Sequence, residues 1–299
     1  DRMEIVRLDG YTEQEKLGIA KHHLMRRQIE RNGLNEGEVT LTDDALLKVI
    51  GDYTREAGVR SLEREIGKVL RKAATKIAAG QVATPLQIDA GDVKEYLGRI
   101  KFHFEAAERT GVPGVSTGLA VTGHGGDVLF IEATEMEGKP GLTLTGQLGD
   151  VMKESAQIAL SYVRSHAEEL GIVGTFENRS FHLHVPAGAV PKDGPSAGTA
   201  MTTALVSLLT GRPVKETVAM TGEVTLQGNV LPIGGVKQKL LAAHRAGMKD
   251  VILPHRNEAD LDDVPESVLK ELNVHLAKRI TEVLAIALEP KEALAIEAA

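Results

Sequence analysis

The chain has 299 residues, of which 42% are hydrophobic, 26% charged and 3% aromatic, and its formal net charge is −7. The length favours two domains, and the composition is that of an ordinary globular protein. The lack of cysteine excludes disulfides, thiolate metal sites and a cysteine nucleophile, while the negative charge and the scarcity of aromatic rings disfavour nucleic-acid binding.

Capping residues and glycines mark four short helices in the first hundred residues. Thr12 and Glu15 form a capping-box pattern that begins a helix reaching about Arg31. The other predicted helices begin at Thr42, at Ser61 and at about Asp92, with a strand-like segment at Leu86–Ile88 before the last. We therefore predict a small four-helix domain over residues 1–104.

The pattern changes after residue 100. Residues 101–115 lose the helical periodicity and contain glycine and proline, so we place a linker at 105–115. Beyond it, predicted strands at 128–133, 142–145, 181–185, 218–220, 223–226, 230–233 and 251–253 alternate with predicted helices at 150–170, after Ser196 and from about Val236. This alternation predicts an α/β domain over residues 116–290. We expect the Ala- and Glu-rich tail, residues 291–299, to be disordered.

Ser196 stands where a loop rich in proline and glycine, VPKDGPSAG, runs into a long apolar helix. One interpretation is a helix cap, which serine often provides. The other is a nucleophile, because such a turn exposes the hydroxyl and the N–H groups at a helix start can hold a developing oxyanion. A serine nucleophile needs a base to remove its proton.

Histidine is the first kind of base to consider. His182 and His184 lie on the same face of a predicted strand. They fit a Ser–His pair, a two-histidine metal site that lacks an assigned third ligand, or simply the polar face of an edge strand.

Lysine is the second kind of base. In the helix that follows the Gly-Gly pivot, Lys239 lies about 60° from the centre of the apolar face and Lys237 about 100°, so Lys239 is expected to point inward. It either extends its ammonium to water or is a buried, neutral base. The second role requires a pKa about three units below the ordinary value of about 10.4, and desolvation can supply that change.

Several motifs together resemble the ATP-dependent Lon proteases. The serine of PKDGPSAG is followed 43 residues later by the lysine of GGVKQKLLAAHRAG, with AMTGEVTLQGNVLPIGG between them. YTREAGVRSLEREI resembles the small helical lobe of the Lon ATPase module, and GDVMKESAQIALSYVRS resembles the long helix of the family's protease domain. The resemblance runs through nearly the whole chain.

The resemblance implies roles for the matching residues. Ser196 matches the family's nucleophile, Lys239 its general base, and Thr221 the residue whose hydroxyl orients the lysine amine. The supporting positions are Asp193, on a loop that shapes or blocks the site, Glu223, an acid near the dyad, and His182 and His184.

Arg60, in GVR, resembles the sensor arginine of the small ATPase lobe, which faces nucleotide in the intact ring. The Walker motifs and the family's N-terminal substrate-binding region are missing, and the sequence begins without Met. We therefore expect a C-terminal fragment, the small lobe of the AAA+ module followed by the protease domain. This fragment alone is expected to bind no cofactor; the resemblance implies ATP and magnesium, and a homohexamer, for the intact enzyme.

The prediction is a serine endopeptidase with a Ser–Lys dyad that cuts unfolded or damaged proteins in the cytoplasm, or alternatively in the mitochondrial matrix. No apolar run is long enough to span a membrane. Two other classes of function stay open. One is a ring-forming interaction module with a latent protease site, in which Asp193 or its loop holds Ser196 and Lys239 apart until the missing lobe is present. The other is a DNA-binding module based on KHHLMRRQIER, but a solvated helix face explains that run better because glutamates dilute it.

Overall fold

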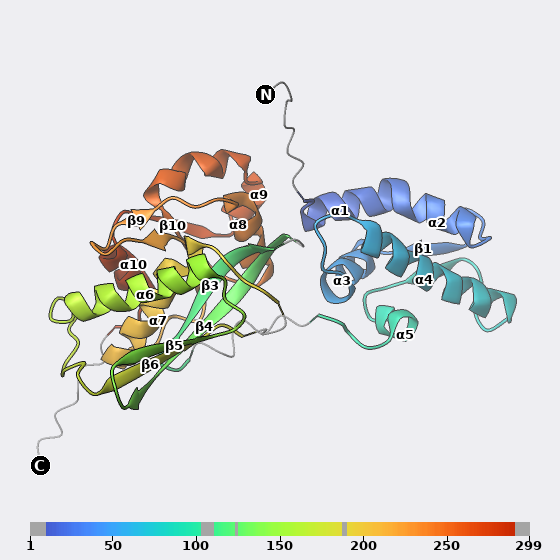
Figure 1. The fold of residues 1–299 in the computed structure, drawn as a ribbon. Helices are drawn as coiled ribbons and strands as arrows, with labels where there is room; N and C mark the ends of the chain where they lie inside the picture. Colours follow the sequence, from blue (N-terminus) through green and yellow to red (C-terminus); the bar gives the residue numbers. More distant parts are fainter. Residues whose placement is uncertain (1–9, 103–110, 123–124, 187–189, 291–299) are drawn as a thin grey trace, which may run out of the picture. The chain divides into compact units, whose positions relative to one another are not determined.

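The computed structural model describes residues 10–102, 111–122, 125–186 and 190–290. The chain forms two compact units (Figure 1). The N-terminal unit is Asp1–Phe104 with Gly123–Gly125, and the C-terminal unit is Glu105–Thr122 with Gly126–Ala299. The predicted disordered tail, 291–299, and residues 105–110 of the predicted linker lie outside the described residues.

The N-terminal unit is mostly helical. Its first helical run consists of α1 (Glu13–Ile19), the π-helical segment η1 (Ala20–Leu24) and α2 (Met25–Arg31), and it is followed by α3 (Asp43–Tyr53), α4 (Arg60–Ala78) and α5 (Val93–Leu97). The predicted capping box is present, because Thr12 Oγ1 accepts from Glu15 N at 3.0 Å and Glu15 Oε2 accepts from Thr12 N at 2.7 Å. The unit also holds a parallel strand pair, β1 (Val39–Leu41) with β2 (Leu86–Ile88). The prediction of a four-helix domain did not include strand β1.

Helix α4 begins at Arg60, one residue before the predicted start, and Ser61 does not cap it. The Glu56 carboxylate does so instead, accepting from Ser61 N at 2.9 Å and from Leu62 N at 2.7 Å. A negative charge at a helix N-terminus is stabilising. The apolar face of α4 is fully buried in the core of the unit, through Leu62, Ile66, Val69, Leu70 and Ala73.

Leu70→Ala is expected to lower the free energy of unfolding of the N-terminal unit by about 2–5 kcal/mol, because Leu70 is 0% exposed and its removal leaves a cavity. Amide hydrogen exchange of peptides from α4 measures this change. Lys72→Ala, an exposed position on the same helix, is the matched control and should shift the same exchange by no more than about 0.5 kcal/mol. Equal effects of the two variants would contradict the assigned core.

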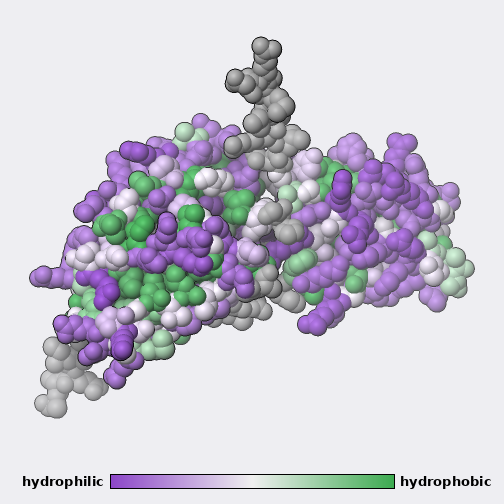
Figure 2. Space-filling model, viewed as in Figure 1, coloured by the Kyte–Doolittle hydropathy of each residue, from purple (hydrophilic) through white to green (hydrophobic). Residues whose placement is uncertain are grey.

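The lysine and arginine side chains of the run at residues 21–31 form ion pairs within the unit. Lys21 pairs with Asp43 at 2.8 Å, and Arg27 and Arg31 pair with Glu63 at 2.7 and 3.1 Å. The surface that the N-terminal unit shows in Figure 2 is largely hydrophilic. These ion pairs support the interpretation of the run as a solvated helix face.

The C-terminal unit is built on a seven-stranded mixed sheet with the strand order β11-β10-β7-β3-β4-β6-β5. β10 is parallel to β7 and β11, β3 is parallel to β7, β5 is parallel to β6, and β4 is antiparallel to β6. The strands are β3 (Val115–Thr122), β4 (Gly125–Glu137), β5 (Gly141–Thr145), β6 (Arg179–His184), β7 (Val218–Met220), β10 (Asp250–Pro254) and β11 (Asn273–Ala277).

A separate antiparallel pair, β8 (Glu223–Val224) with β9 (Val230–Leu231), follows β7. The helices are α6 (Asp150–Ser165), the 3-10 turn η3 (Pro195–Ala197), α7 (Gly198–Thr210), α8 (Val236–Arg245), the 3-10 helix η4 (His255–Asp263), α9 (Glu266–Leu269) and α10 (Ile280–Ala287). This mixture of helices and a sheet agrees with the predicted class. In the described parts of the chain, no helix is both long and apolar enough to cross a membrane.

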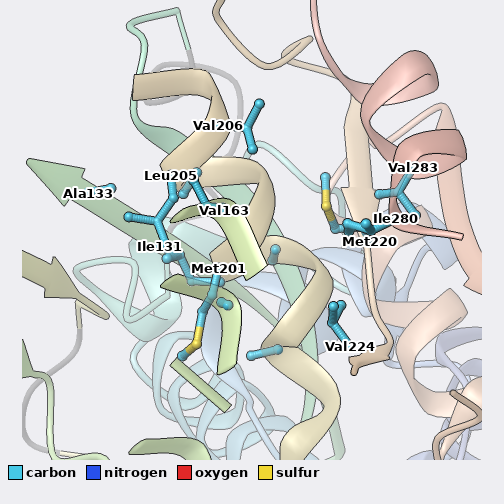
Figure 3. Packing of buried hydrophobic residues seen from close by; sticks show 14 of the residues in the cluster. Ile131, Ala133, Val163, Met201, Leu205, Val206, Met220, Val224, Ile280 and Val283 are labelled. Carbon is cyan, nitrogen blue, oxygen red and sulfur yellow. The ribbon is translucent and has the colours of Figure 1, made fainter. Parts of the chain in front are cut away.

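Helix α7 lies at the centre of the core of the C-terminal unit. Its first ten residues are all buried. Figure 3 shows Leu205 grouped with Ile131 of β4 and Val163 of α6, and Met220 of β7 grouped with Val283 of α10. Ser116 of β3 donates its hydroxyl to Ala200 O at 2.7 Å, which joins α7 to the sheet. The residues directly before Gly198 are therefore attached to a helix that is held firmly in the core.

Candidate active site

Ser196 is the middle residue of η3, directly before α7. Gly194 has a φ of +112°, a backbone conformation that favours glycine, and it turns the chain into η3. The Ser196 side chain is partly exposed, and no side chain caps η3 or α7. The N-cap interpretation of Ser196 is therefore wrong, because α7 begins at Gly198 with Ala197 as its cap residue.

Lys239 lies one turn into α8, which begins directly after the left-handed Gly235. It is 2% exposed, whereas Lys237 is partly exposed. The prediction that Lys239 rather than Lys237 points inward is confirmed.

The start of β4 touches α8 beside Lys239. A Cβ atom on Gly126 would lie 1.9 Å from the backbone oxygen of Gln238, so only glycine permits this approach. Arg245 Nη2 also donates to Gly126 O at 3.1 Å. These contacts hold the helix that carries Lys239 against the sheet.

Thr221 connects the lysine to the serine. Its hydroxyl lies 3.0 Å from Lys239 Nζ and 3.1 Å from Ser196 O, and the side chain is 1% exposed. A hydroxyl has one proton to donate, and the Ser196 carbonyl can only accept it, so Thr221 accepts its other bond from the lysine. Gly222 N also donates to Ser196 O at 2.9 Å. The segment after β7 therefore holds both the backbone of the serine and the amine of the lysine.

Burial controls the charge of Lys239. Desolvation lowers the pKa of its amine from 10.5 to about 8. About one lysine in ten is then neutral at pH 7, compared with fewer than one in a thousand at the ordinary pKa. A neutral amine that spends one N–H on Thr221 keeps its lone pair for another proton.

Asp193 anchors the loop that precedes Ser196. Its Oδ1 accepts from Met152 N at 2.9 Å, in the first turn of α6, and from Gly194 N at 2.8 Å, and these N–H groups hold the pKa of the carboxyl below its ordinary value. A Cβ atom on Gly149 would lie 2.2 Å from Asp193 Cγ. The carboxylate is thus directed at the start of α6, and within the described residues no hydrogen bond or ion pair joins it to Lys239.

His182 and His184 are on β6 and share one partner, Thr145 of β5. Thr145 Oγ1 lies 2.9 Å from His182 Nε2 and 2.7 Å from His184 Nδ1. The edge-strand interpretation is wrong, because β6 lies between β4 and β5 and the edge strand is β5. The part of the chain that the structure describes has no group of three or more His, Cys, Asp or Glu side chains that could hold a metal ion.

The two remaining predicted residues are not joined to the dyad. Glu223 begins β8 and is partly exposed, and its carboxyl makes no hydrogen bond to Ser196 or Lys239 in the described structure. Arg60 is the exposed first residue of α4, in the N-terminal unit.

Sequence reasoning missed two residues beside the site. Lys192 is 9% exposed, and its Nζ donates to backbone carbonyls around the serine loop. Asn257 is 3% exposed, accepts from Ile233 N at 3.0 Å and donates to Ile233 O at 2.8 Å, which fixes the chain just before α8. Lys192 could have been found as the one lysine inside the Pro- and Gly-rich loop, whereas no local signal marks Asn257.

Comparison with known proteins agrees with this arrangement. Residues 87–290 match the model of the C-terminal proteolytic domain of Lon protease, and residues 30–86 match that of the Lon protease AAA+ ATPase lid domain. The Lon protease of Salinispora arenicola is 62% identical over 293 residues, which cover 98% of this chain and 37% of that protein.

The Lon protease of Mycolicibacterium smegmatis is 63% identical over 290 residues, 97% of this chain and 37% of that protein. The Lon protease of Escherichia coli is 54% identical over 290 residues, with the same coverage. The chain therefore spans little more than a third of the length of these relatives. With a proteolytic-domain match over 204 of its 299 residues (87 to 290) and these identities, the chain belongs to the Lon protease family.

Proposed function

We propose that this chain is a serine endopeptidase in which Ser196 is the nucleophile and Lys239 the general base. One observation carries the proposal: a buried amine, with its pKa lowered to about 8, is linked by the Thr221 hydroxyl to the backbone of a serine that caps no helix. A serine paired with a lysine is a known variant of the Ser-His-Asp arrangement.

In the proposed reaction, neutral Lys239 takes the proton of Ser196 as Oγ attacks the peptide carbonyl. Backbone N–H groups beside Ser196 stabilise the oxyanion, and the lysine then protonates the leaving amine. Lys239 next activates the water that hydrolyses the acyl-enzyme. Within the described residues no hydrogen bond joins Ser196 Oγ to Lys239 Nζ, and such bonds often tighten only when substrate binds.

The intact protein is proposed to degrade unfolded or damaged polypeptides as a homohexamer driven by ATP and magnesium. The match of residues 30–86 to a Lon ATPase lid supports this extension, and Arg60 is the residue proposed to face nucleotide. The bacterial origin of the relatives favours the cytoplasm over the mitochondrial matrix. We propose no membrane partner, and the ion pairs of residues 21–31 give no support to DNA binding.

Cleavage is expected to lose activity about tenfold per pH unit below about pH 8, because only neutral Lys239 can accept the serine proton. Single-turnover acylation measured from about pH 5 to about pH 10 isolates this step. A flat profile across the range, with chemistry rate-limiting, would rule out the lysine base.

The proposal is tested by mass spectrometry of an unfolded polypeptide incubated with the chain, without ATP, beside Ser196→Ala. Fragments from the parent chain alone support the endopeptidase. Assembled rings that cut nothing would instead favour the interaction module with a latent site.

A further inference from the structure

The loop at residues 190–195, which delivers Ser196, is mostly exposed, and two consecutive residues anchor it. Val190, Pro191 and Asp193 are exposed, and Lys192 is buried. Lys192 N donates to Gln147 O at 3.0 Å, and its own carbonyl accepts from Gly149 N at 2.7 Å. Asp193 adds the bond to the first turn of α6. The position of the nucleophile therefore depends on the pair Lys192–Asp193.

The Lys192 side chain extends to the ends of two neighbouring strands. Its Nζ donates to Gly146 O at 2.9 Å, just after β5, to Val185 O at 3.4 Å, just after β6, and to Val190 O at 3.0 Å, in the loop itself. One ammonium thus links the loop to both strands.

The two anchors have opposite charges that suit their partners. The ends of β5 and β6 present the carbonyl oxygens of Gly146 and Val185 to the Lys192 ammonium, and the start of α6 presents N–H groups, which attract a carboxylate. Gly146 and Gln147 have φ of +115° and +59°, so the chain turns directly after β5, where Gly146 O accepts from the lysine. Burying an ammonium without hydrogen-bond partners is costly. We therefore expect a buried lysine with three carbonyl partners to have a structural role and not only to keep the protein soluble.

We propose that Lys192 is a positioning residue, whose ammonium holds the nucleophile loop against the ends of β5 and β6 so that Ser196 is presented to Lys239. The proposal rests on the Ser196–Lys239 dyad. It assigns different charge states to the two lysines, since Lys239 acts as a neutral amine and Lys192 as a cation.

The proposal requires Lys239 to be neutral and Lys192 to be charged at the same pH, so cleavage should have an upper as well as a lower pH limit. An ammonium has three N–H donors and an amine two, so deprotonation weakens the link to the carbonyls. Burial lowers the pKa of Lys192, so its charge is lost at a lower pH than that of an ordinary lysine. The charged and titratable groups closest in sequence to its contacts are His182 and His184 on β6, Asp193 in the loop, and Asp150 and Lys153 on α6.

Lys192→Met and Lys192→Arg test the proposal, with Lys153→Met, an exposed lysine on α6 paired with Asp150, as the matched control. Kinetics of peptide cleavage are followed from about pH 6 to about pH 11. We expect Lys192→Met to lower kcat about 100-fold with a much smaller change in KM, because misplacing a reacting group by about 1 Å has an effect of that size. Lys192→Arg should recover at least tenfold, since a guanidinium stays charged and supplies donors.

The loss of cleavage activity at alkaline pH distinguishes a positioning role of Lys192 from a role in stabilising the fold alone. The parent chain and Lys153→Met should lose activity at alkaline pH, and Lys192→Arg should not. Parent-like kcat in Lys192→Met would overturn the proposal. So would an alkaline loss that persists in Lys192→Arg, and this second criterion holds even if Lys192→Met fails to fold. Ser196→Ala in the same series separates the two ideas, because residual cleavage by that variant would instead refute the dyad.

Discussion

Lys239→Met is expected to abolish cleavage and, at neutral pH, to stabilise the C-terminal unit. Loss of the base should lower the rate by at least about 1,000-fold, within the range of general-base catalysis combined with nucleophile activation. Methionine has a similar length and no charge, so it occupies the same buried space beside Val236 and Leu240 without the cost of desolvating an ammonium.

The stabilisation depends on pH in a defined direction. The pKa of Lys239 is about 8 in the folded chain and 10.5 in an ordinary lysine, so between these values the unfolded chain binds more protons. The free energy of unfolding of the parent therefore rises from pH 8 to 10.5. Below pH 8 it is about 3 kcal/mol lower than it would be with an ordinary lysine pKa. Lys239→Met should lose most of this rise and keep only the part that comes from the lowered pKa of Lys192.

Urea unfolding of the C-terminal unit at about pH 7 and about pH 10.5 measures the difference. Lys237→Met, on the same helix but partly exposed, is the matched control and should keep both the activity and the pH dependence of the parent. An active Lys239→Met variant would refute the base, and a parent whose stability is flat between pH 8 and 10.5 would refute the lowered pKa.

Thr221→Val is expected to lower kcat about 100-fold or more while leaving the fold intact. Valine has the shape of threonine but lacks the hydroxyl that accepts from Lys239 and donates to Ser196 O. The lysine amine then loses the acceptor that orients it. Because an acceptor favours the charged form, its loss should lower the pKa of Lys239 further, and the acid limb of activity should move to lower pH.

Two variants accompany this measurement. Thr221→Ser keeps the hydroxyl and should stay within about tenfold of the parent. Thr117→Val makes the same chemical change at a buried hydroxyl for which the described structure gives no partner, and it should leave activity unchanged. If Thr221→Val behaved like Thr117→Val, the hydroxyl would have no orienting role.

Local patterns in the sequence predicted the burial of Lys239 and the turn at Ser196 better than the surroundings of these two residues. The helical phase of Lys239 and the Pro- and Gly-rich turn at Ser196 are properties of a few consecutive residues. By contrast, β3 was missed because Ser116 and Thr117 are fully buried in it, so its sequence does not alternate as a half-exposed strand should. Helix α6 ends at Ser165 rather than at the predicted Leu170. Residues 166–171 form turns, although Ala167 and Leu170 still pack against the core.

Other features depend on strand order, which no short pattern encodes. An edge strand was one interpretation for His182 and His184, because alternation describes one strand and not its neighbours, and the strand order excludes it. The contacts of Lys192 with Gly146, and of Asn257 with Ile233, join residues far apart in the sequence. Only the folded sheet brings these groups together.

The close contact between Gly126 and Gln238 restricts how this fold can evolve. Any side chain on residue 126 would push against a backbone atom of α8, which cannot be shortened as a flexible side chain can. A glycine with no chemistry of its own is thus tied, by space alone, to the helix that carries the proposed base, Lys239. Substitution at the start of β4 is confined to residues that leave this backbone contact free, so purifying selection on the helix of the proposed base should extend to this strand.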